Sequence, residues 1–177
     1  ESFRKDNQIT PIVFMGYMNT FESLGAELFM KKAASAGLDG ILIVDMPPEE
    51  STDFSREANK FDIDIIRLIA PTTSAKRAKE ICSQCSGYVY YISVKGITGA
   101  GNLNAEEVIG KVGVLRKLTD LPIAIGFGIK DAESASSVMN VADGIVAGSV
   151  FVDLIGKNEN VIKNVALKTR ELSEVLN

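Results

Sequence analysis

Two glycine turns follow consecutive apolar runs in the second half of the chain. Gly126-Phe127-Gly128 ends the first run, and Gly148-Ser149 ends the next one and opens a short helical stretch. Backbone N–H groups at the start of a helix bind anions without help from Lys or Arg. The pattern therefore predicts a phosphate site built from the amides of Gly128, Gly148 and Ser149, with Ser149 as the helix cap.

A third glycine-rich segment, YYISVKGITGAG, begins as a buried-strand pattern and ends as a loop. Gly96, Gly99 and Gly101 lie close together in it, so ordering this loop costs conformational entropy. Loops of this kind close over a ligand when it binds. We expect residues Lys95–Asn102 to form a lid.

Charged groups suited to acid–base chemistry are few. The sequence contains no His, which excludes Ser-His-Asp and Cys-His catalysis and any His-ligated metal. Asp45 ends an apolar run, and two roles stay open for it: acid–base chemistry, or accepting hydrogen bonds that hold the following Pro-Pro turn. Glu49 and Glu50 are expected in the first turn of a helix, where they complement its dipole. No carboxylate pair emerges.

The two cysteines, Cys82 and Cys85, have CxxC spacing at the end of a predicted helix. A redox CxxC usually opens a helix, where the dipole lowers the thiol pKa. A structural zinc site needs two further Cys or His ligands, and the sequence has none. We interpret both residues as unreactive thiols and predict no metal site.

Apolar runs of strand length alternate with amphipathic helical stretches. The predicted strands are Ile9–Tyr17, Gly40–Asp45, Asp64–Ala70, Gly87–Ser93, Leu121–Gly128 and Asp143–Ser149. The predicted helices are Phe21–Gly37, Pro47–Phe61, Thr73–Cys85, Asn104–Thr119, Lys130–Val141, Ser149–Lys157 and Glu159–Leu176. Continuous apolar strands are buried on both faces, as in a parallel sheet.

Six β/α units fit two architectures of the α/β class. One is an open doubly wound sheet, but no GxGxxG follows the first strand, so the dinucleotide-binding version lacks its fingerprint. The other is a (β/α)8 barrel, which typically takes ~250 residues. The chain has 177 residues and would lack about two of the barrel's units.

Composition narrows the class of protein further. Hydrophobic residues make up 46% and charged residues 24% of the chain, which is ordinary globular composition. The net charge of −4 argues against a nucleic-acid-binding surface. No apolar run reaches the ~18 residues of a membrane span, and no secretory signal is evident at the start. We expect a cytoplasmic protein that binds neither nucleic acid nor membrane.

Four stretches of the sequence closely resemble tryptophan synthase alpha chains, in that family's order and spacing. They are VDMPPEES (Val44–Ser51), YYISVKGITGAGN (Tyr90–Asn102), PIAIGFGI (Pro122–Ile129) and DGIVAGSVFVDLI (Asp143–Ile155). The resemblance implies a (β/α)8 TIM barrel, of which residues 1–177 form a single partial domain with strands 3–8 and the C-terminal helix.

The resemblance also implies an activity, the aldol-type cleavage of indole-3-glycerol phosphate to indole and glyceraldehyde 3-phosphate in tryptophan biosynthesis. The family is a lyase whose alpha chain carries no cofactor itself. It works with a beta chain that contains PLP, in an alpha2beta2 complex. We expect the same small phosphorylated substrate and the same partner for this chain.

By the same resemblance, the predicted anion site has a named ligand. Gly128, Gly148 and Ser149 match the family's phosphate-binding backbone. Phe127 matches the aromatic residue that lies against the indole ring, and Tyr90 matches the tyrosine beside the catalytic carboxylate.

Further substrate-binding positions follow from the same matching. Met15 and Tyr17 fall at the end of strand 3, near the substrate. Thr98 and Gly99 match the lid, where the threonine closes over the site. Asp45 matches the aspartate at the end of strand 4 and is expected to support the loop there.

The chain departs from the family in two places. Val94 stands where the family often has Arg before the first lid glycine. The family's two catalytic acids, a Glu at the end of strand 2 and an Asp in the loop that follows it, lie in a region resembling LGxPFSDPxADGP, and nothing in this chain matches that region. The resemblance therefore implies no catalytic residue in these 177 residues, and we expect them to be inactive alone.

Two alternative functions stay open. One is another phosphate-binding barrel, such as a thiamine-phosphate synthase or a pentose-phosphate epimerase. The other is a non-catalytic fragment that binds a phosphate ligand or the beta chain.

Overall fold

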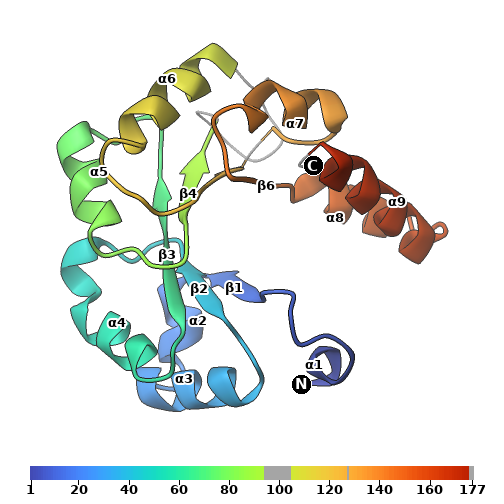
Figure 1. Cartoon of the computed structure of the whole chain (residues 1–177). Coiled ribbons are helices and arrows are strands. Elements are labelled where there is room, and N and C mark those ends of the chain that lie inside the picture. Colours follow the sequence, from blue (N-terminus) through green and yellow to red (C-terminus); the bar gives the residue numbers. More distant parts are fainter. Residues whose placement is uncertain (94–104, 127, 176–177) are drawn as a thin grey trace. The chain divides into compact units, whose positions relative to one another are not determined.

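A computed structural model describes residues 1–93, 105–126 and 128–175 of the chain. Strands and helices alternate along it, as Figure 1 shows. The six strands follow one another in the sheet in chain order, β1-β2-β3-β4-β5-β6. The pairs β1–β2, β2–β3 and β5–β6 are parallel. This is the predicted α/β class, with one strand near each predicted apolar run.

The chain divides into two compact units, and the first comprises Glu1–Leu68 and Lys79–Val89. Its elements are α1 (Ser2–Asp6), β1 (Val13–Gly16), α2 (Met18–Glu22), α3 (Ala26–Ser35), β2 (Gly40–Ile43), the 3-10 turn η1 (Pro48–Glu50), α4 (Thr52–Asn59), β3 (Asp64–Ile69), whose last residue belongs to the second unit, and the second half of α5 (Ala75–Cys82). The Cα register pairs Gly40 with Val13 and with Asp64.

An apolar core joins the strands of the first unit to its helices. Ile41, Ile43 and Ile65 of the sheet are buried in one cluster with side chains from α2, α3 and α4. Within it, the Phe21 ring meets the edge of the Phe54 ring at a centroid distance of 6.2 Å. Burying aliphatic and aromatic side chains of this size contributes about 1.5–3 kcal/mol each, so this core fixes the helices on the sheet.

The predicted helix Phe21–Gly37 is two helices. Gly25 lies between them as the N-cap of α3, with a φ of +76°, a conformation that favours glycine. Likewise, the predicted helix Pro47–Phe61 begins as the 3-10 turn η1 and becomes α-helical only at Thr52.

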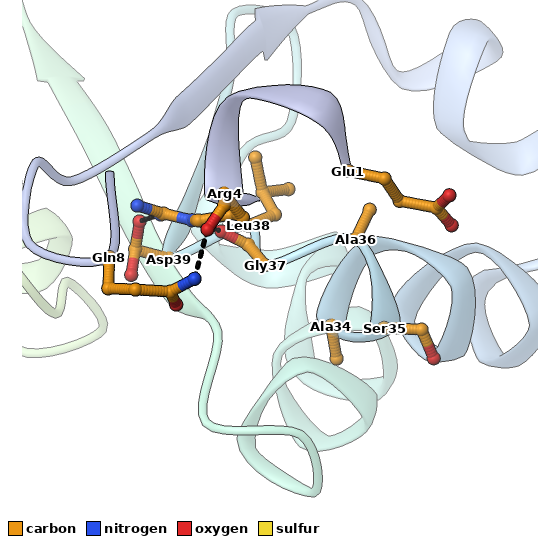
Figure 2. A pocket seen from close by; sticks show the side chains of 9 residues that line it. All are labelled: Glu1, Arg4, Gln8, Ala34, Ser35, Ala36, Gly37, Leu38 and Asp39. Atoms are coloured by element: carbon orange, nitrogen blue, oxygen red, sulfur yellow. Dashed lines mark hydrogen bonds and ion pairs between the residues drawn. The ribbon is translucent and has the colours of Figure 1, made fainter. Parts of the chain in front are cut away.

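The short helix α1 is not predicted by the sequence pattern because it buries none of its side chains. It is held instead by Arg4, whose guanidinium donates to the Gly37 carbonyl at 2.8 Å and forms an ion pair with Asp39. Figure 2 shows the open pocket beside this contact and the bonds that join Arg4 to Asp39 and to Gln8. Among the residues that line this pocket, Arg4 bonds Gly37 and Asp39, and the Gln8 amide group donates to the Arg4 carbonyl.

The second unit comprises Ile69–Ala78 and Tyr90–Asn177. Its elements are the first half of α5 (Ala75–Cys82), β4 (Val89–Ile92) from Tyr90 on, α6 (Ala105–Leu115), β5 (Ile123–Gly126), α7 (Ala132–Met139), β6 (Gly144–Val146), α8 (Ser149–Gly156) and α9 (Val161–Glu174). Helix α9 packs against α8 and α7 (Figure 1). No helix among the described residues is long and apolar enough to cross a membrane.

The cysteine pair lies at the end of α5, as predicted. Cys82 is the last residue of this helix and is buried. Burial raises the pKa of Cys85 to about 12, because the charged thiolate loses its hydration. The Cys85 Sγ donates to the Tyr88 carbonyl at 3.1 Å. The thiol therefore stays protonated and helps to hold the loop before β4.

Helix α7 begins with a complete capping box. The Ser134 amide donates to Asp131 Oδ1 at 2.9 Å, and the Asp131 amide donates to Ser134 Oγ. The Ser134 hydroxyl also donates to Asp131 Oδ1 at 2.7 Å, and this bond, followed by the bond from the Ser134 amide, lowers the pKa of Asp131. Glu171 of α9 accepts a further bond from the Ala132 amide at 3.2 Å, so a carboxylate from α9 binds the same helix end.

We expect Cys85 to resist alkylation in the folded chain. In a Cys82→Ala variant at pH 8, iodoacetamide should modify Cys85 at least ~10²-fold more slowly than in urea, because the thiolate is the nucleophile and its pKa is raised. Mass spectrometry of timed samples measures both rates. Comparable rates in the folded and the unfolded chain would contradict this account.

We expect the Asp131 cap to stabilise the fold in a pH-dependent way. Replacing Asp131 with Ala should lower the free energy of unfolding by about 1 kcal/mol at neutral pH. Because the folded pKa is lowered, the stabilisation is present above the unfolded pKa of about 4 and is lost as pH falls through the folded value.

Urea denaturation from pH 6 down to pH 3 measures this difference. Asp131→Asn is the matched control, because the amide oxygen still caps but does not titrate. The gap between Asp131→Asn and Asp131→Ala should stay constant, whereas the gap between the parent and Asp131→Ala should shrink. A parent gap that does not change with pH would rule out the carboxylate as the source.

Candidate functional site

The two predicted glycine turns lie at neighbouring strand ends of the second unit. Strands β5 and β6 pair in parallel with Gly126 opposite Val146. Gly128 and Gly148 therefore each lie two residues beyond a member of this pair. Gly128 has a φ of +79°, which few side chains tolerate. Both glycines are exposed, so their backbones are open to a ligand at this edge of the sheet.

Helix α8 begins at the predicted residue, but its cap differs from the predicted one. Gly148 is the cap and Ser149 is the first helical residue, with no capping bond from a side chain. The expected capping role of Ser149 is therefore wrong.

The amides at the start of α8 are arranged for an anion. The first bonds of the helix run from the amides of Phe151 and Val152 to the Gly148 carbonyl. The N–H groups that precede them in the first turn have no acceptor within the helix. Such N–H groups, together with the helix dipole, attract negative charge.

Tyr90 lies against the end of β5. It is 4% exposed, and a Cβ built on Gly126 would lie 2.0 Å from its hydroxyl oxygen. Only glycine leaves room for this ring. Ser93 closes the same corner, because its hydroxyl and its amide both donate to the Gly126 carbonyl, at 2.7 and 2.9 Å. Tyr90, one of the predicted residues, is thus held at a fixed place beside the glycine turn.

The remaining described residues of the predicted site lie in the first unit. Met15 is in β1 and Tyr17 directly follows it, and both side chains are exposed. Asp45 follows β2, is exposed, and accepts a hydrogen bond from the Met18 amide at 2.7 Å. Asp45 therefore bonds the loop after β1 and not the Pro-Pro turn considered from the sequence.

Other predicted site residues lie outside the described part of the chain. They are Thr98, Gly99 and Phe127, together with Val94 and the whole Lys95–Asn102 lid. Within the described ranges, no group of three His, Cys, Asp or Glu side chains is placed to hold a metal ion. The described strand ends of the second unit thus offer backbone amides for an anion and a tyrosine side chain, and those of the first unit offer the Asp45 carboxylate.

Sequence reasoning missed Gly126 and Ser93 as parts of this site. The sequence pattern predicts only a turn at Gly126, although the absence of a side chain there leaves room for the Tyr90 ring. A signal was present: a large aromatic residue in one predicted strand and a glycine in the next apolar strand indicate complementary volumes. The register that brings them together was not visible from the sequence.

Comparison with known proteins identifies the family. The sequence profile of the family "Tryptophan synthase alpha chain" matches residues 1–177. The chain is 48% identical over 159 residues to the tryptophan synthase alpha chain of Thioalkalivibrio sulfidiphilus, covering 90% of this chain and 60% of that one. It is 43% identical over 178 residues to the alpha chain of Polynucleobacter necessarius, covering 99% and 67%.

Solved structures give the same result. The alpha chain from Legionella pneumophila superposes with a TM-score of 0.84 at 32% identity, over 99% of this chain and 66% of that one. A structure of the tryptophan synthase a2b2 complex from Pyrococcus furiosus gives 0.87 at 31% identity, over 98% and 70%. The chain spans about three fifths of the length of the first curated relative. It belongs to the tryptophan synthase alpha chain family, with the fold of a partial TIM barrel.

Proposed function

We propose that this chain forms the substrate-phosphate half of an alpha-type lyase that cleaves indole-3-glycerol phosphate to indole and glyceraldehyde 3-phosphate. The observation that carries the proposal is the pairing of Gly126 with Val146, which aligns Gly128 with the start of α8. The substrate's phosphate would accept hydrogen bonds from the amides of Gly128, Gly148 and Ser149 at ~3 Å, the usual charge-assisted range.

The rest of the substrate would lie across the carboxyl ends of the strands, where ligands bind in barrels. Phe127 would lie against the indole ring, and the buried Tyr90 would orient the acid beside it. Met15 and Tyr17 would border the substrate, while Thr98 and Gly99 would close over it. Together these residues bind and orient the substrate and exclude water.

The proton transfers need groups that these 177 residues do not supply. In the proposed reaction, a Glu delivers a proton to indole C3 while the bond from C3 to the glycerol carbon breaks, and the adjacent hydroxyl loses its proton to become the aldehyde. An Asp stabilises the indole N–H as positive charge develops. Both acids would come from the family region that resembles LGxPFSDPxADGP.

The proposed partner is a tryptophan synthase beta chain. It is supported by family membership and by the Pyrococcus furiosus structure, which concerns mutual activation of an a2b2 complex. PLP would belong to the beta chain, and we assign no cofactor to this chain. The second candidate function is ligand or beta-chain binding without turnover, and the lack of an acid pair at the described strand ends favours it for the 177 residues alone.

We expect Gly148→Val to weaken anion binding without unfolding the chain. Nothing lies within 4 Å of a Cβ built on Gly148, so a side chain fits the fold but obstructs the approach of a phosphate. Calorimetric titration with indolepropanol phosphate should show at least tenfold weaker binding. Gly156→Val, at the other end of α8 and equally free of close neighbours, is the control. Equal affinity of Gly148→Val and parent would count against the site.

We expect the chain alone to release indole from indole-3-glycerol phosphate at least ~10²-fold more slowly than an intact alpha chain. A positioned general acid or base typically contributes ~10²–10⁴-fold. Adding a polypeptide with the two β/α units that carry the family's acids should restore turnover.

The same assay with that polypeptide's catalytic Glu changed to Gln should show association without turnover. Indole release by the chain alone at a rate near that of an intact alpha chain would mean that the catalytic groups are wrongly assigned to a region outside these 177 residues. Demonstrated association with no rescue would mean that the fragment is not the remainder of the barrel.

A further inference from the structure

A charged residue lies within the apolar layer between sheet and helices of the first unit. Arg67 is in β3 and is only 3% exposed. Side chains alternate along a strand, so Arg67 shares its face with Ile65, which belongs to the core cluster with Phe54 of α4. Burial lowers the pKa of Arg67. Because arginine keeps its charge over the physiological range, a buried guanidinium needs hydrogen-bond acceptors.

Three acceptors surround the guanidinium, and all are uncharged oxygen atoms. Nη1 donates to the Met46 carbonyl at 3.2 Å, Nη2 to Ser55 Oγ at 3.3 Å, and Nε to the Gln84 carbonyl at 3.3 Å. The planar fork of arginine thus joins β3 to the loop after β2, to helix α4 and to the loop before β4. A lysine has no such fork.

A second buried contact ties the same segment. Ser51 is fully buried, and its Oγ lies 2.8 Å from the Pro48 carbonyl and 2.9 Å from Gln84 Oε1. Residues Asp45–Ser51, here called the Asp45 turn, are therefore fastened at Met46 by Arg67 and at Ser51 by Gln84. Gln84 takes part in both contacts, through its backbone and through its side chain.

The first residue of the Asp45 turn lies just beyond the carboxyl end of β2. Asp45 itself accepts the bond from the Met18 amide, directly after Tyr17. A line of contacts thus runs from Arg67 through Met46 and Asp45 to the loop after β1. Stability alone does not explain a charge in this layer, because apolar residues of similar volume often stabilise as much as buried polar groups or more.

We propose that Arg67 is the positioning residue of the Asp45 turn, which its guanidinium fixes against β3 so that the Asp45 carboxylate stays at the end of β2. Its importance for substrate binding rests on the proposed function, because Tyr17 and Asp45 border the substrate only there. The geometric role of Arg67 does not depend on turnover.

Hydrogen exchange followed by NMR tests this role without an activity assay. In Arg67→Met, the Met18 amide should exchange at least tenfold faster than in the parent, and the Asp45 carboxyl resonance should shift. The Asp64 amide, which donates to the Asp39 carbonyl at the opposite end of the strands at 2.9 Å, should keep its protection. Arg56→Met is the matched control, since Arg56 is an exposed arginine of α4 that pairs only with Asp53 among the described contacts.

Two results would overturn the proposal. Equal loss of protection at Met18 and Asp64 would make Arg67 a general stabiliser, and unchanged Met18 exchange would show that it does not hold the turn. If Arg67→Met does not fold, Ser51→Ala loosens the same turn without leaving a buried charge. It should speed Met18 exchange by a smaller factor, and no change would likewise reject the proposal. If the exchange of the Met18 and Asp64 amides is as expected but the chain and the added polypeptide together release no indole, only the proposed function is rejected.

Discussion

Parallel pairing of the strands is the constraint on which the functional edge depends. A parallel strand must be followed by a crossover before the next one, so every strand in such a sheet ends at the same edge. Residues far apart in the sequence, such as Asp45 and Met18, meet there because each lies two residues beyond the end of a strand. The helices carry few of the site residues, and their main task is to bury the other face of the strands.

The proposed phosphate site is built mostly from backbone. The turn at Gly128 and the start of α8 present N–H groups, and these need no charged side chain to attract a phosphate. Side chains such as Tyr90 and Ser93 fix the shape of the corner. An acidic chain with a net charge of −4 can hold an anionic ligand this way, because the attraction is local and directional.

The periodicity of the sequence was sufficient for the order and type of the strands and for most helices, because continuous apolar runs have few other solutions. Periodicity did not predict a helix boundary that depends on a single backbone angle, as at Gly25, which divides a predicted helix. It also did not predict α1, because this helix is held by a contact distant in the sequence, the hydrogen bond from Arg4 to the Gly37 carbonyl. The glycines of the site were found from their spacing, whereas the tasks of Gly126 and Arg67 depend on a strand register that no local pattern contains.

The contact between Tyr90 and Gly126 makes the two positions share one fixed volume. A side chain added at Gly126 has to displace the ring, whereas a smaller residue in place of the tyrosine would leave a void of matching size. The pair therefore behaves as one unit under mutation. A larger residue at position 126 is tolerated only together with a smaller residue at position 90. A library that varies one position at a time would score both as immutable, and paired randomisation would recover combinations that such a library never samples.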